Sequence, residues 1–245
     1  RSDFTEEEFR NFDAYLERGG NLFILGEPKR QQFMNPVIER LGLRFADGII
    51  VSPSEVNLDD LVAANIKEGA AKVSENYIRY FRSGYSIMTP SACAVEVIDS
   101  TKGFEITEVL ASAGKGSWVE KETTDFINEK SVLNPAVGEV EKSNSIMLYL
   151  TRPVNNKEQR IFVIGDADCI STLELSQNRP GFRSSNFTLI TETFRNLSYG
   201  EFPVEASRVN PPDDRVLVTR NVIFGIRVVL MWIIPLLFVT GCITL

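Results

Sequence analysis

The sequence predicts an α/β fold in which helices and a mostly parallel sheet form three layers. Three observations favour this fold. A helix leads into a buried strand over residues 4–26, and a second helix and strand follow over residues 31–51. The apolar strand in "RIFVIGD", residues 160–166, continues through an acidic loop into a helix at residues 186–197. Helices that alternate with buried strands are typical of βαβ units and of a sheet with helices on its faces.

The composition excludes several classes of function. The 245 residues carry a net charge of −7 without a basic stripe, which argues against nucleic acid as a partner, because phosphate binding needs clustered lysine and arginine. The chain has no histidine, the commonest general base and zinc ligand. Cys93, Cys169 and Cys242 lack CxxC spacing, so we expect no metal, no cofactor and no disulfide framework, although Cys93 and Cys169 could pair.

The first predicted helix follows Ser2 or Asp3, either of which could cap it. Three glutamates in its first turn suit the positive end of the helix dipole, and apolar residues recur at helical spacing up to Leu16. Gly19-Gly20 ends the helix, and "NLFILG" is then a buried strand. Because a helix that feeds a buried strand is the second half of a βαβ unit, we expect a further strand before residue 1.

The middle of the chain alternates in the same way but less regularly. A helix is predicted around residues 31–41 and ended by Gly42, and a strand over residues 48–51. Between residues 86 and 110, the pieces "YSIMTPSACAVEVID" and "GFEITEVLAS" alternate with period two and are rich in valine and isoleucine, which favours strands.

The second half of the chain contains a long predicted loop and a hairpin. Residues 111–144 have little periodicity, so we interpret them as a loop on one face, where binding groups often collect. "SIMLYLTRP" and "QRIFVIGD" are apolar strands, and the connection at residues 153–158, "PVNNKE", is typical of a hairpin turn.

The last 45 residues predict attachment to a membrane. Residues 221–245 are apolar with Arg227 as the only charge, and they are long enough to cross a bilayer as a helix that Pro235 would kink. Residues 201–220 contain three prolines and are interpreted as an extended tether, which leaves residues 1–200 as the α/β domain. The arginines that precede the apolar segment would, on that flank alone, place the domain in the cytoplasm.

Several motifs together resemble a known family. "FRNFDAYLERGGNLFILGEP", "GKGSWVEK", "RIFVIGDADCIS", "SSNFTLITETFRNLSYG" and "VVLMWIIPLLFVTG" occur in an order similar to that of the auxiliary component of ABC-2 type transporters. The group resembled is the gliding-motility-associated GldG type, common in Bacteroidetes, and the likeness covers nearly the whole chain. It implies a flavodoxin-like or glutamine-amidotransferase-like domain in the periplasm, anchored to the cytoplasmic membrane by a C-terminal helix. It also implies association with a permease and a cytoplasmic ATPase.

Acidic residues follow two of the predicted strands. Glu27 follows "NLFILG", and Asp166 and Asp168 follow "RIFVI". In a parallel sheet, ligands bind beyond the carboxyl ends of the strands. Together with Asn186 at the start of the last helix, these residues could bind a sugar hydroxyl, a cation or a peptide amide. Trp118, in the polar loop, is a candidate recognition residue.

A purely structural role for the same residues stays open. Asp166 or Asp168 could cap local backbone amides, Gly165 could permit a tight turn, and Trp118 could anchor its loop in the core. No residue is predicted to be catalytic, because histidine is missing and Cys169 lacks the glycine-flanked turn of a nucleophile elbow.

We therefore expect a non-enzymatic, membrane-anchored accessory subunit of an ABC-2 type transporter. It would bind a periplasmic partner or substrate and couple to the permease, and it would contact membrane lipid through its C-terminal helix. Two alternatives remain: a stand-alone glycan- or lipid-binding module, and a degenerate hydrolase that uses Glu27, Asp166 and Asp168.

Overall fold

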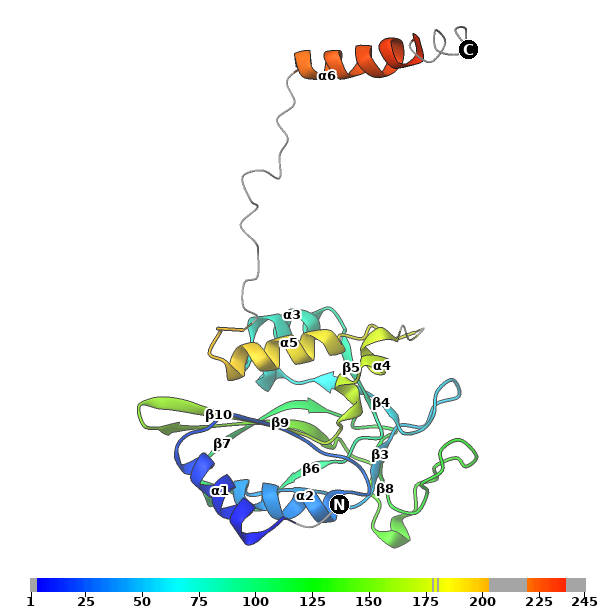
Figure 1. The fold of residues 1–245 in the computed structure, drawn as a ribbon. Helices are drawn as coiled ribbons and strands as arrows, with labels where there is room; N and C mark the ends of the chain where they lie inside the picture. Colours follow the sequence, from blue (N-terminus) through cyan, green and yellow to red (C-terminus); the bar gives the residue numbers. More distant parts are fainter. Residues whose placement is uncertain (1–3, 178, 180, 203–219, 237–245) are drawn as a thin grey trace. The chain divides into compact units, whose positions relative to one another are not determined.

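The structure, a computed structural model, describes residues 4–177, 179, 181–202 and 220–236. The chain divides into two compact units, residues 1–203 and residues 204–245, and each is described by itself. The first unit holds a central sheet with helices on both faces (Figure 1).

The central sheet has six strands in the order β1-β10-β9-β7-β4-β5. The strands predicted around residues 22–25, 86–110 and 145–165 are confirmed, and all of them lie in this sheet except the one at residues 95–97, which lies in a separate small sheet. β4 was not predicted from the sequence. The strands are β1 (Leu22–Leu25), β4 (Leu61–Ile66), β5 (Ser86–Pro90), β7 (Glu105–Ala111), β9 (Ser145–Val154) and β10 (Lys157–Ile164).

The strand directions differ in part from those expected. Four of the six strands, β1, β10, β7 and β5, run in the same direction, but only β1 and β10 are parallel neighbours. The other four neighbouring pairs are antiparallel, so the sheet is mixed and departs from the all-parallel sheet of a flavodoxin-like form. For β9 and β10 the reason is their short connection, because parallel strands need a crossover of a dozen or more residues.

The turn between β9 and β10 confirms the predicted hairpin. Asn155 and Asn156 both have positive φ, 50° and 62°, and Val154 pairs with Lys157. A two-residue turn with both central residues in the left-handed region matches the twist of the strands, and asparagine tolerates that conformation.

Helices cover both faces of the sheet (Figure 1). On one face, α1 (Glu6–Glu17) and α2 (Gln31–Ile38) contribute Leu16 and Ile38 to a core with β1, β9 and β10. On the other face, α3 (Glu75–Arg82) and α5 (Asn186–Leu197) contribute Tyr77 and Leu189 to a second core. The short helix α4 (Thr172–Ser176) lies beside α5. The expected three layers are therefore present.

Local signals in the sequence set where the first two helices begin and end. Thr5, and not Ser2 or Asp3, caps α1: its side chain accepts from Glu8 N while Glu8 Oε2 accepts from Thr5 N, a reciprocal capping box. Gly19, with a φ of 83°, follows α1 as expected. The predicted second helix continues from α2 into a 3-10 turn and ends at Gly42, as predicted.

Two small sheets extend the fold. β2 (Leu43–Phe45) pairs with β6 (Val95–Val97), and β3 (Ile49–Val51), which was predicted, pairs with β8 (Trp118–Glu120). The remaining described segments are five 3-10 helices: η1 (Glu39–Leu41), η2 (Glu68–Lys72), η3 (Ser100–Lys102), η4 (Pro135–Val137) and η5 (Asp168–Ile170).

Residues 111–144 are largely loop, as predicted, but buried carboxylates give the loop a fixed shape. Asp59, fully buried, accepts from Ser131 N at 2.7 Å. Glu139, 2% exposed, accepts from Lys121 N at 2.9 Å and from Asn134 N at 2.7 Å. These bonds satisfy backbone N–H groups that no strand partner reaches.

The second unit is helical where it is described. α6 (Arg220–Val228) continues into the π-helical segment η6 (Val229–Ile233), in which Ile234 N–H bonds to Val229 O. Pro235 follows, and its missing N–H accounts for the widened turn. Within the described residues, we find no helix of the length and apolarity that a membrane crossing requires. Residues 203–219 of the predicted tether and residues 237–245 of the predicted span lie outside the described residues.

Gly165, directly after β10, lies against the main chain of Cys93. Cys93 N–H donates to Gly165 O at 2.7 Å, and a Cβ on Gly165 would stand 1.9 Å from Cys93 O. Its φ is not positive, so the glycine serves this close approach and not the tight turn that the sequence suggested.

We expect Gly165→Ala to lower the free energy of unfolding by about 2 kcal/mol or more, because backbone must move to admit the methyl group. Urea denaturation measures this. Gly114→Ala is the matched control, since the nearest atoms lie 4.0 Å from its Cβ position, and it should change stability by less than about 0.5 kcal/mol. Equal effects at both positions would contradict the steric explanation.

Candidate functional site

Three of the predicted residues meet at one edge of the sheet. β1 and β10 are parallel, and Leu25 pairs with Ile164. Glu27 lies two residues after Leu25 and Asp166 lies two residues after Ile164, so both follow the same end of the sheet. Asp168 begins η5, two residues further along. Glu27 and Asp168 are exposed, whereas Asp166 is buried. The expectation that these carboxylates share an edge is confirmed.

Asp166 is the most unusual group at this edge. Its side chain is 1% exposed; Oδ1 accepts from Asp168 N at 2.7 Å, and Oδ2 has no hydrogen-bond partner among the described residues. Burial raises the pKa of this carboxyl to about 8, with a further contribution from the Asp168 charge. Asp166 therefore holds a proton at neutral pH, and its contact with Asp168 N is the backbone cap that the sequence allowed.

The neighbours of Asp166 do not form a nucleophilic centre. Burial and the nearby charge of Asp168 raise the pKa of Glu27, although Arg30 opposes the shift. Burial, reinforced by the carboxylates, raises the pKa of the Cys93 thiol to about 12 and raises that of Cys169 as well. A thiol with a raised pKa is a poor nucleophile at neutral pH. Both cysteines are free, so the possible Cys93–Cys169 disulfide is not formed.

Asn186, the first residue of α5, lies inside the protein and not at a ligand site. Its Oδ1 accepts from Met88 N at 2.9 Å, and its Nδ2 donates to Met88 O at 2.7 Å and to Cys169 O at 2.8 Å. At 5% exposed, the amide joins β5, η5 and α5. With both donors and its acceptor used by main chain, it has no group free for a sugar, a cation or a peptide.

Trp118 anchors its loop, which was the structural alternative for this residue. It is 7% exposed, on β8, and packs with Ile49, Val51 and Phe126 in a small separate core. Its Nε1 donates to Glu120 Oε2 at 3.2 Å. Because its ring is covered, Trp118 is not the exposed recognition residue that its polar surroundings suggested.

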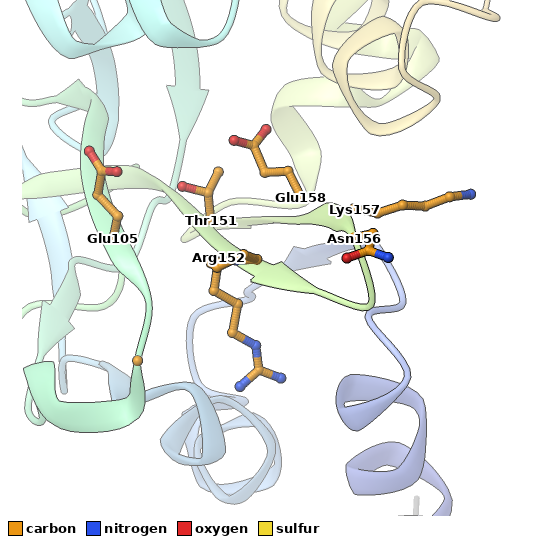
Figure 2. A pocket seen from close by; sticks show the side chains of 8 residues that line it. Glu105, Thr151, Arg152, Asn156, Lys157 and Glu158 are labelled. Carbon is orange, nitrogen blue, oxygen red and sulfur yellow. The ribbon is translucent and has the colours of Figure 1, made fainter.

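A depression of about 520 Å³ lies at the opposite end of the strands from Glu27 and Asp166, beside the β9–β10 hairpin (Figure 2). It is lined by the start of β7, the end of β9 and the start of β10, and Figure 2 shows Glu105, Thr151 and Glu158 on one side of the hairpin with Arg152 below them. From the sequence, this hairpin is predicted only as a turn. Alternating charges on adjacent strands were the signal that could have indicated it.

Three of the four charged side chains around this depression already have partners within the protein. Arg152 donates to Gln159 Oε1 at 2.7 Å and to Leu16 O at 3.0 Å. Glu158 bonds to Arg160 at 2.8 Å, and Glu105 forms an ion pair with Lys72. The depression therefore presents few uncommitted groups to a ligand.

Metal chemistry finds no support in the described part of the chain. No group of three or more aspartate, glutamate or cysteine side chains there has an arrangement that could hold a metal ion. The three carboxylates at the sheet edge are close enough to interact electrostatically without forming such a cage.

A scan of protein-family models finds none that matches this chain, and a search of curated proteins finds no match. The likeness to the GldG type thus depends on the sequence motifs alone.

The titration of Asp166 predicts a pH-dependent stability. Its pKa is about 8 in the folded state against 3.8 for the ordinary group, so the folded state retains a proton that the unfolded state loses. The contribution of Asp166 to stability is fully present below about pH 4, falls as the pH rises to about 8, and is then constant. The steepest expected slope is about 1.4 kcal/mol per pH unit.

Asp166→Asn should remove this slope, so the variant gains stability relative to the wild type between about pH 4 and 8. Urea denaturation at several pH values gives the comparison. Asp168→Asn is the control. It keeps the hydrogen bond from the main-chain N–H of residue 168 to Asp166 and removes a charge that raises the pKa of Asp166. The dependence of stability on pH should therefore persist but end at a lower pH. If the unfolding free energy of Asp166→Asn changed with pH as steeply as that of the wild type, Asp166 would not be the group responsible.

Asn186→Ala should lower the free energy of unfolding by about 2–4 kcal/mol, because it leaves Met88 N, Met88 O and Cys169 O buried without a partner. Asn57→Ala is the control, since the structure gives the Asn57 side chain no hydrogen bond. Thermal or urea unfolding measures both. A stable Asn186→Ala variant would show that the amide is not structural.

Proposed function

We propose that this protein is a non-enzymatic accessory subunit of an ABC-2 type transporter. Its α/β unit lies in the periplasm, binds a partner or substrate there, and is coupled to the permease through a segment anchored in the cytoplasmic membrane. Hydrolysis of ATP belongs to a separate cytoplasmic subunit. The order of the sequence motifs supports the family, and the chemistry of the sheet edge supports a structural role over a catalytic one.

One observation carries the non-enzymatic part of the proposal. Asn186, placed where an α/β enzyme holds its ligand, is used entirely by the main chain of three elements. The thiols at the same edge have raised pKa values, and the chain has no histidine to activate them. Such a site favours a rigid scaffold over a reaction centre.

The apolar composition of residues 221–245 supports anchoring. Arg227 is their only charge, and along α6 and η6 the second unit itself does not cover side chains such as Phe224, 70% exposed, and Trp232, 73% exposed. A helix that is apolar on all sides needs lipid or protein around it. Conformational coupling to the permease would then pass through residues 204–220.

A degenerate hydrolase is the second candidate, and the raised pKa of Asp166 favours it. A protonated carboxyl beside an ionised carboxylate is an arrangement that general acid catalysis uses. However, Asp166 is 1% exposed, so a substrate reaches it only if the loop at residues 165–171 moves. Turnover that is lost in Asp166→Asn, with folding intact, would support this candidate.

Purification from the native membrane tests the proposed function. The full-length protein is solubilised in mild detergent, and the copurifying proteins are identified and quantified. We expect an ABC permease and its ATPase in a fixed molar ratio to this chain.

A truncated variant that ends at residue 203 is the matched control, and it should lose the permease and ATPase if residues 204–245 provide the coupling. Elution of the full-length protein without either subunit would contradict the transporter assignment. The acidic edge would then be tested as an independent binding or catalytic site.

A further inference from the structure

The outer surface of the helical layer made by α3 and α5 carries exposed phenylalanine side chains. α5 turns Leu189 toward the sheet, and Phe187 and Phe194, which are seven residues apart, lie on the opposite side of the helix. Phe187 is 70% exposed. The structure describes five exposed phenylalanines in the first unit, and four of them belong to this layer: Phe81, Phe187, Phe194 and Phe202. Apolar surface that gathers in this way marks a site of interaction.

Arginine side chains without an acidic partner lie beside these rings. α3 turns Tyr77 into the core, so Arg79 and Arg82 point to solvent on its other side. Arg183, in the segment before α5, donates to Ser83 O at 3.4 Å and so lies at the end of α3. Among the described residues, none of these three arginines forms an ion pair.

The two helical layers of the first unit differ in charge. The chain carries a net charge of −7, and α1, on the opposite face of the sheet (Figure 1), has five carboxylates and one arginine. α3 and α5 together have three arginines and two glutamates, and one of these, Glu192, is buried and bonded to Arg195. The outer surface of the α3–α5 layer is therefore positive, although the chain as a whole is acidic.

We propose that the α3–α5 face, which comprises Arg79, Arg82, Arg183, Phe187, Phe194 and Phe202, binds a membrane surface that contains anionic phospholipid. The guanidinium groups bind the lipid phosphates, which they match in shape and charge. The phenylalanine rings enter the apolar region just below the headgroups, where they leave water. The inference rests on the membrane anchoring in the proposed function, and it adds which face of the α/β unit meets the bilayer.

The path of the chain favours lipid over protein as the occupant. Phe202, the last described residue of the first unit, packs against Phe194 with ring centroids 5.8 Å apart, so the connection to the apolar segment starts on this face. Residues 203–219 reach at most about 60 Å when fully extended. With residues 221–245 in a bilayer, this connection keeps the face near lipid at a high effective concentration. A weak attraction to lipid is therefore sufficient for docking.

Quenching of a fluorophore on the α3–α5 face tests the inference. The full 245-residue chain is reconstituted into vesicles of phosphatidylcholine alone, or of phosphatidylcholine and phosphatidylglycerol in a ratio of about 2:1. A membrane-impermeant fluorescent maleimide then labels Ser83→Cys, or Asn11→Cys on α1 as the matched control, in a Cys242→Ser chain whose other cysteines are buried. We expect the anionic vesicles to lower acrylamide quenching at residue 83 by about twofold or more and to leave quenching at residue 11 unchanged.

Paired arginine variants separate this face from a general effect of charge. Each arginine near an anionic surface changes binding about fivefold, so Arg79→Gln/Arg82→Gln should weaken docking by more than about tenfold and restore quenching at residue 83. Arg10→Gln/Arg18→Gln removes the same charge from α1 and its C-cap, and the protection should persist. All four side chains are exposed, so the fold should tolerate both pairs.

The apolar part of the contact is tested by Phe187→Ala, which should restore part of the quenching at residue 83. Phe4→Ala, at the exposed phenylalanine outside this layer, should not. Equal quenching at residue 83 in the two kinds of vesicle would overturn the inference, as would equal protection at residues 83 and 11 or protection that survives Arg79→Gln/Arg82→Gln. Protection that appears only when purified permease is added would identify a protein as the occupant and would also overturn it.

Failure of the inference and failure of the proposed function give different results. Flotation of the chain with neutral vesicles measures the anchoring by residues 204–245, and the effect of phosphatidylglycerol measures binding by the α3–α5 face. If the chain does not float with neutral vesicles, the anchor is absent, and the inference then predicts flotation with the anionic vesicles alone. Copurification tests the transporter assignment separately.

Discussion

Side-chain amides that bond to the main chain of neighbouring strands are the interaction on which this fold depends. Asn186 bonds to both main-chain groups of one residue in β5, and Asn35 does the same to Phe45, accepting from its N–H at 2.9 Å and donating to its C=O at 3.1 Å. Asn21 Oδ1 accepts from Arg160 N at 2.8 Å and so extends the β1–β10 ladder by one residue before its first pair, Leu22 and Ile161. An asparagine amide presents the same donor and acceptor as a peptide group. Helices α2 and α5 and the start of β1 are fixed to strands by these bonds.

Buried carboxylates perform the equivalent task in the loop at residues 111–144. Glu120, 2% exposed, accepts from Glu122 N and Thr123 N, both at 3.0 Å, and from the ring of Trp118. Those backbone bonds help to lower the pKa of Glu120 against the opposing effect of burial. Asp166 differs from Glu120. One backbone N–H donates to its Oδ1 and its Oδ2 has no hydrogen-bond partner among the described residues, so the effect of burial dominates and the pKa of Asp166 is raised. Burial and the neighbouring carboxylates Asp168 and Glu27 therefore outweigh the backbone hydrogen bonds at Asp166, whereas the bonds to Glu120 outweigh its burial.

This arrangement connects structure to the proposed role of the protein. The carboxyl ends of β1 and β10 form an edge that is acidic at the surface and holds a proton beneath it, while the residues that might have made it reactive stabilise the scaffold. The depression beside the β9–β10 hairpin offers few free groups to a ligand, since Arg152, Glu158 and Glu105 are already paired there. A rigid α/β unit of this kind suits an accessory subunit that transmits position and does not transform a substrate.

The sequence by itself determined the local elements. Apolar periodicity, Gly19, Gly42 and the "NN" turn marked α1, α2 and the β9–β10 hairpin correctly, because these signals act over a few residues, whereas β4 and α3 were not predicted. It also placed Glu27 and Asp166 at one edge. The tertiary structure alone decided that most neighbouring strands are antiparallel, that Trp118 is buried and that the amide of Asn186 is fully used. Those outcomes depend on partners tens of residues away, such as Met88 for Asn186, and no local pattern specifies which distant main-chain group a side chain will meet.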